Sequence, residues 1–122
     1  MAGTTPRAKL SLRLAASQGD RIATASALIK QSLDQGLCLR WSYNRTVMRV
    51  APQILYTDKG EIFVDAIAIE KNGEAPDELK LGRFKLSGLS GIAITTEPFA
   101  PMESIDLGSV RYQEAVLARA GP

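Results

Sequence analysis

Three cationic side chains are the residues of this chain best suited to binding chemistry. Arg49, Arg83 and Lys85 lie on segments of alternating polarity and could converge on one anion if those segments share a face. Guanidinium and ammonium groups bind phosphate or carboxylate through charge-assisted hydrogen bonds. The alternative is that all three are solvated on the convex side of a sheet.

Aromatic side chains offer a second kind of contact. Trp41, Tyr43 and Tyr56 could form a platform on which a base or ligand ring stacks. At strand spacing, however, large aromatics more often belong to the core. Trp41 is therefore interpreted as a core residue, while Tyr43 and Tyr56 fit either role.

Catalytic chemistry has few candidates in this sequence. The chain contains no histidine, the commonest general base near neutral pH and the commonest metal ligand. The absence of histidine also rules out a Cys–His pair, and because Cys38 is the only cysteine, an internal disulfide and a cysteine zinc site are ruled out as well. Cys38 is interpreted as a small buried residue rather than a reactive thiol. The sequence predicts a protein that is not an enzyme and has no cofactor or metal.

Length and charge narrow the class further. The 122 residues suit one domain, and a formal charge of +2 does not by itself indicate nucleic-acid binding. Residues 35–57 carry three cations and no acid, so this stretch is either a solvated basic face or an anion-facing surface. No apolar run approaches the ~20 residues of a membrane span. With a lone cysteine, this predicts a cytoplasmic protein with no membrane partner.

One helix must position part of this chemistry. Apolar residues at helical spacing predict a helix over Asp20–Gln35, with Asp20 as its N-cap and Gly36 as its left-handed C-cap. Before it, residues 8–15 alternate like a strand but could also begin a helix. Met1–Pro6 is small and polar and is expected to be disordered.

The remaining elements are predicted to be strands. Five segments alternate in polarity and are separated by turn residues, at 37–43, 47–56, 61–70, 79–86 and 89–95. Pro52 interrupts the second strand and predicts an edge or bulge that bends the sheet. Met48, Val50, Ile54 and Tyr56 are expected to share one face of that strand.

These elements predict a mainly β (α+β) fold. We expect a small five-stranded antiparallel Sm-like barrel with the N-terminal helix over one end. Residues 1–19 would be an N-terminal arm, residues 20–97 the helix and barrel domain, and residues 98–122 a C-terminal extension. A short helix is predicted within that extension, over residues 109–120.

The order of these segments resembles the WYL domain family. The matching segments are Leu39-Arg40-Trp41-Ser42-Tyr43, Arg49-Val50-Ala51-Pro52, Ile62-Phe63-Val64 and Phe84-Lys85-Leu86-Ser87-Gly88-Leu89. WYL domains are similar to Sm-like barrels, usually accompany a DNA-binding helix-turn-helix in bacterial transcription regulators, and are thought to sense a ligand such as a nucleotide or nucleic acid.

The resemblance assigns roles to several residues. Phe63 would stand at the tyrosine of the name-giving Trp-Tyr-Leu, and Lys85 at the basic residue after the family's phenylalanine. Ser87 and Gly88 stand where the family commonly carries aspartate and arginine, and a helix-turn-helix does not precede the module. The resemblance therefore implies a divergent, standalone member.

Together these observations predict a ligand-sensing or regulatory module. Its ligand would be an anionic small molecule or single-stranded nucleic acid. The predicted contacts are Arg49, Arg83 and Lys85, with Tyr43, Tyr56 and Phe63 available for stacking. The alternative is a protein-interaction or oligomerisation module that pairs its exposed strand edges with a second copy or a regulatory protein.

Overall fold

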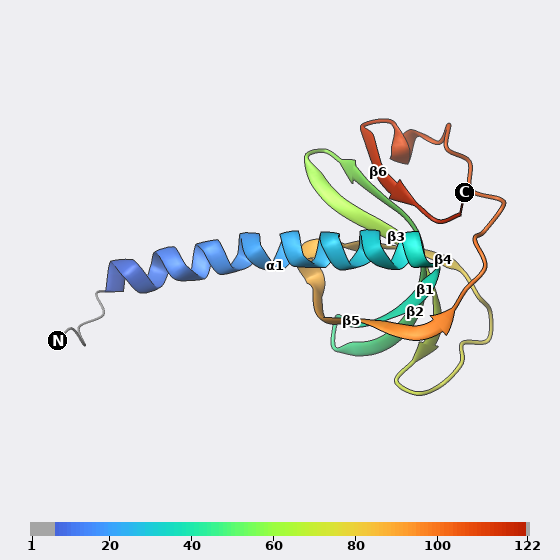
Figure 1. Cartoon of the computed structure of the whole chain (residues 1–122), viewed down its shortest axis with the longest axis horizontal. Coiled ribbons are helices and arrows are strands. Elements are labelled where there is room, and N and C mark those ends of the chain that lie inside the picture. Colours follow the sequence, from blue (N-terminus) through green and yellow to red (C-terminus); the bar gives the residue numbers. More distant parts are fainter. Residues whose placement is uncertain (1–6, 122) are drawn as a thin grey trace.

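A long N-terminal helix and one six-stranded antiparallel sheet make up the structure, a computed structural model that describes residues 7–121. Helix α1 spans Arg7–Gln35, and its C-terminal half lies against the sheet while its N-terminal half projects away (Figure 1). The mainly β, α+β class is confirmed. The expected disorder of Met1–Pro6 lies outside the described residues.

Helix α1 begins earlier than predicted. Residues 8–15 are helical, so the strand alternative is wrong, and Asp20 lies inside the helix rather than at its N-cap. The physical reason is composition, since residues 7–18 contain no glycine, proline or β-branched residue and are rich in good helix formers. The predicted end is confirmed. Gly36 adopts a φ of 68°, and its N–H donates to the Ser32 carbonyl at 2.8 Å.

The strands follow the predicted order, with one addition. They are β1 (Leu37–Tyr43), β2 (Thr46–Asp58), β3 (Glu61–Lys71), β4 (Leu81–Lys85), β5 (Leu89–Pro98) and β6 (Ala115–Arg119). The sheet has the order β4-β3-β2-β1-β5, with β6 paired to β2, and every pairing is antiparallel. It is an open six-stranded sheet rather than five strands alone.

Pro52 marks the point at which β2 changes neighbours. On one edge β2 pairs with β1 as far as Val50 and with β6 from Ile54 onward, so the missing N–H of Pro52 falls between two partners. The register with β3 also slips between Pro52 and Ile54, which confirms the predicted bulge.

This bulge reverses the faces of the strand. Val50 and Leu55 belong to the main core, whereas Ile54 and Tyr56 belong to a second cluster. The prediction that Met48, Val50, Ile54 and Tyr56 share a face is therefore wrong. An extra residue on one strand shifts the two-residue alternation by one position, and all side chains beyond it exchange faces.

The C-terminal prediction is also wrong. Residues 109–120 do not form a helix; a short 3-10 turn, η2 (Val110–Tyr112), leads into β6. Beyond Pro52 one edge of β2 would otherwise be unpaired, and β6 satisfies those backbone groups. The Ala120 N–H extends the pairing by donating to the Gln53 carbonyl at 2.8 Å.

The main core lies between α1 and the sheet. Ala25, Ile29 and Leu33 on α1 are buried against the sheet, which confirms the predicted apolar stripe. Trp41 is 1% exposed and meets the ring of Phe84 edge-on at 5.2 Å, which confirms its core assignment. The second cluster, Ile54, Tyr56 and Tyr112, is packed by Phe63 and Ile105.

Candidate functional site

Four of the six predicted contact residues lie on one face of β2, β3 and β4. Cross-strand pairing places Phe63 opposite both Tyr56 and Lys85, and residues that pair directly share a face. The guanidinium carbon of Arg83 lies 3.8 Å from the centre of the Phe63 ring, and Phe63 stacks on Tyr56 with 5.9 Å between ring centres. We call Phe63, Arg83 and Lys85 the aromatic–cation face. Tyr56 is 0% exposed and lies beneath Phe63, so the prediction that Tyr56 contacts a ligand is wrong.

The other two predicted residues lie elsewhere. Tyr43 meets Phe84 edge-on at 5.1 Å and belongs to the margin of the main core. A Cβ at position 88 would lie 2.8 Å from Cε1 of Tyr43, which explains why Gly88 ends the turn between β4 and β5. Arg49 lies beside Glu70 and Glu97. The six residues therefore do not converge on one point.

Each predicted cation already has a carboxylate partner. Arg83 bonds Asp58 at 2.7 Å, and Lys85 bonds Glu61 at 2.8 Å. Arg49 bonds Glu97 at 2.9 Å and lies 3.6 Å from Glu70. The side chains of all three cations are about one-third exposed or more, and such pairs contribute roughly 0–1 kcal/mol each. An incoming anion would compete with weak internal partners.

A buried carboxylate lies beside this face and was not predicted. Asp65 on β3 is fully buried and accepts hydrogen bonds from the hydroxyls of Tyr56 at 2.6 Å and Tyr112 at 2.5 Å. The guanidinium of Arg111 donates a third at 2.9 Å. The sequence held a signal, because Asp65 is the only charged residue within the apolar run 62–69. A charge in a buried strand needs partners.

The two tyrosines of this network are held in their protonated form. Burial, followed by the hydrogen bond to Asp65, raises the pKa of Tyr112 to about 12. The same two causes raise the pKa of Tyr56 well above its ordinary value. Both hydroxyls therefore act as donors to Asp65 and tie the C-terminal segment to β2 and β3.

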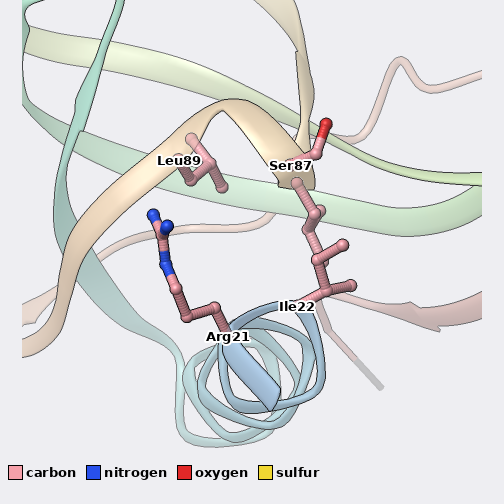
Figure 2. Close-up of a pocket in the computed structure, with 5 residues that line it drawn as sticks. Arg21, Ile22, Ser87 and Leu89 are labelled. Carbon is pink, nitrogen blue, oxygen red and sulfur yellow. The ribbon is translucent and has the colours of Figure 1, made fainter. Parts of the chain in front are cut away.

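A small hollow opens on the other side of the sheet, between α1 and the start of β5. Arg21 and Ile22 extend from the helix toward Leu89 and Ser87 on the opposite wall (Figure 2). Its volume is about 130 Å³, well below the roughly 300–1,000 Å³ of pockets that take a small organic molecule. This hollow is too small for the predicted ligand.

Residues 7–121 offer no metal site, no membrane-spanning helix and no reactive thiol. Within that range no group of three or more histidine, cysteine or acidic residues could hold a metal ion, and no helix is long and apolar enough to cross a membrane. Cys38 is fully buried, and burial, reinforced by the charge of Glu97, raises the pKa of its thiol. These two effects make the thiol a poor nucleophile.

Comparison with protein-family models, with curated proteins and with solved structures gives no match.

Proposed function

We propose that this chain is a non-enzymatic binding module that takes an anionic ligand, a nucleotide or a short single-stranded nucleic acid, on its aromatic–cation face. The observation that carries the proposal is the stack of Arg83 over Phe63, with Lys85 as the cross-strand neighbour of Phe63. All three side chains reach solvent at least in part. A flat aromatic and guanidinium surface with a cation beside it suits a ligand that has both a ring and a phosphate.

Binding on this face would work by exchange of partners. Phosphate oxygens would replace Asp58 at Arg83 and Glu61 at Lys85, and a base would stack on the exposed side of the Arg83–Phe63 pair. The Tyr56 ring, which stacks on Phe63, would hold the Phe63 ring in place from beneath. Arg49 and Tyr43 take no part, since they lie outside the face.

The fold gives further support. The helix that packs on a sheet of order β4-β3-β2-β1-β5 supports the proposed likeness to Sm-like barrels, the fold to which WYL domains are similar, although the sheet itself is open. In this proposal β6 is an added strand on the edge of β2. A regulatory role of the WYL kind stays a prediction.

The test is a binding titration with defined probes. Short fluorescent single-stranded RNA and DNA, together with a panel of mononucleotides, would be titrated at about 50 and about 200 mM salt. We expect binding that weakens as salt rises, and a loss of about tenfold or more in affinity when Arg83 and Lys85 are both replaced by alanine.

A matched control comes from the same region of the chain. Lys80→Ala removes an exposed cation whose ion pair among the described residues is with Glu78 at 3.8 Å, and it should leave binding nearly unchanged. Phe63→Leu keeps apolar volume but removes the ring, and it should weaken mononucleotide binding. The proposal is wrong if no probe binds at low salt, or if Lys80→Ala costs as much affinity as the double variant.

A second candidate function is self-association through strand edges. Strands β4 and β5 are the outermost strands of the β4-β3-β2-β1-β5 order, and β5 carries no charged residue from Leu89 to Thr96. Long uncharged edges pair readily with another chain, because their outward N–H and C=O groups lack partners.

This second candidate is tested by light scattering coupled to gel filtration over a range of protein concentrations. Ala93 is exposed on β5, so Ala93→Lys should shift an oligomer toward monomer, while Ser104→Lys in an exposed loop should not. A wild-type protein that stays monomeric at every concentration would exclude self-association.

A further inference from the structure

A cleft between α1 and the C-terminal segment is separate from the aromatic–cation face. It has a volume of about 700 Å³, within the range of pockets that hold small organic molecules. One wall is the last two turns of α1. The other, the C-terminal wall, is formed by Phe99, Pro101 and residues 118–121. Figure 1 shows the C-terminal segment lying beside this end of the helix.

Hydrogen bonds fix the position of the C-terminal segment that lines the cleft. The Phe99 N–H donates to the Gly36 carbonyl at 3.0 Å, which ties the C-terminal wall to the end of the helix. Gln53, 2% exposed, holds the rest of the C-terminal wall. Its side-chain oxygen accepts from the Met102 N–H at 2.7 Å, and its backbone carbonyl accepts from Ala120. These bonds pre-form the walls, so a ligand would not have to order them.

The lining combines apolar area with unpaired positive charge. Leu33, Phe99 and Pro101 contribute apolar surface. Lys30 and Arg119 line the cleft as exposed cations, and neither belongs to any ion pair found among the described residues. This differs from the aromatic–cation face, where each cation has a carboxylate partner.

One acid moderates this charge. Asp34 also lines the cleft, which leaves two cations against one carboxylate and a net charge of +1. The C-terminal end of α1 adds a partial negative charge on the same side as Asp34. An anionic group would therefore sit toward Arg119, and a ligand with more than one negative charge would meet repulsion from Asp34.

From these observations we propose that the cleft binds an amphipathic organic monoanion, meaning a molecule with an aromatic or aliphatic body and one carboxylate or sulfonate group. The body would lie against Leu33, Phe99 and Pro101, and the charged group would be held by Arg119 and Lys30. This site is independent of the proposed function, because it shares no residue with the aromatic–cation face.

A pair of fluorescent probes tests the proposal directly. Anilinonaphthalene sulfonate has an aromatic body and one negative charge, and N-phenylnaphthylamine has nearly the same body without the charge. The full chain should bind the sulfonate with saturation and bind the neutral probe more weakly. Lys30→Gln and Arg119→Gln should each weaken sulfonate binding by about five- to tenfold and leave the neutral probe unchanged.

Two further variants test the role of charge: one should strengthen sulfonate binding, and the other is a control that should not change it. Asp34→Asn removes the opposing charge and should strengthen sulfonate binding, while Arg45→Gln removes an exposed cation in a distant turn and should change nothing. Amide chemical shifts should move at residues 33–36 and 118–121 when the sulfonate is added. The proposal is overturned if Lys30→Gln and Arg119→Gln bind the sulfonate like wild type, or if both probes bind equally well.

Discussion

Replacement of Asp65 by asparagine should destabilise the fold far more than an ordinary surface change. The carboxylate is fully buried and holds three donors, from Tyr56, Tyr112 and Arg111. Asparagine has one carbonyl oxygen, so its NH₂ group would face donors that need an acceptor. Removal of one partner from a buried charged network costs about 3–5 kcal/mol, a large part of the ~5–15 kcal/mol that holds a small domain together.

The smaller change Tyr112→Phe gives an independent measure of the same network. It removes one hydrogen bond to a charged acceptor and should cost about 1.5–3 kcal/mol. When Asp65 is already replaced by asparagine, Tyr112→Phe should cost at least about 1 kcal/mol less than it does alone. The reason is that the carboxylate to which the Tyr112 hydroxyl donates is then absent.

The changes in the free energy of unfolding can be measured by urea unfolding, followed by the fluorescence of Trp41. It is the only tryptophan of the chain and is 1% exposed. Tyr43→Phe is the matched control, since no hydrogen bond from the Tyr43 hydroxyl is found among the described residues, and it should cost well under about 1 kcal/mol. If Asp65→Asn costs less than about 1 kcal/mol, or if its effect and that of Tyr112→Phe simply add, the network does not anchor the C-terminal segment.

Three further predictions concern pH, packing and thiol reactivity. Because the folded pKa of Tyr112 is about 12 and an unfolded tyrosine titrates near 10, the contribution of Tyr112 to stability is complete below about pH 10 and falls by ~3 kcal/mol as pH rises from 10 through 12; urea midpoints across that range should show this loss, and Tyr112→Phe should reduce it. Gly88→Ala should cost about 1–3 kcal/mol by thermal unfolding, since the new methyl group would clash with the Tyr43 ring; an equal loss when Tyr43 is also shortened to alanine would contradict this cause. Cys38 should react with a thiol reagent only under unfolding conditions, given its burial and raised pKa, and rapid labelling of the native protein would refute that reasoning.

Local signals in the sequence predict the β-hairpins well. Asn44 and Arg45 have φ values of 50° and 64°, and this turn between β1 and β2 falls where the sequence placed it. Two successive positive φ values give the tight hairpin turn whose twist matches that of the strands. Turns and the alternation of polar and apolar residues depend on residues that are close in the chain. They can therefore be predicted from a short stretch of sequence.

Non-local effects account for the predictions that are wrong. Pro52 predicts an edge or a bulge, and the bulge is present, but uninterrupted alternation beyond it assigns Ile54 and Tyr56 to the wrong face. Ala115–Arg119 has the composition of a helix but pairs with β2 because that edge would otherwise be unpaired. A free edge sixty residues away in the chain is a property of the folded sheet, not of the segment itself.

The candidate site shows the same division. Residue type predicts Phe63, Arg83 and Lys85 as ligand contacts, which stays a prediction. The structure shows that the register of β3 and β4 places the three on one face. Their carboxylate partners could not be inferred in this way. Asp58 is 25 residues from Arg83, and the two side chains meet only because the folded sheet brings the end of β2 beside β4. Whether a surface cation is free for a ligand depends on such distant partners. The absence of an ion pair at Lys30 and Arg119 within the described part of the chain is likewise a property of the folded molecule and not of the local sequence.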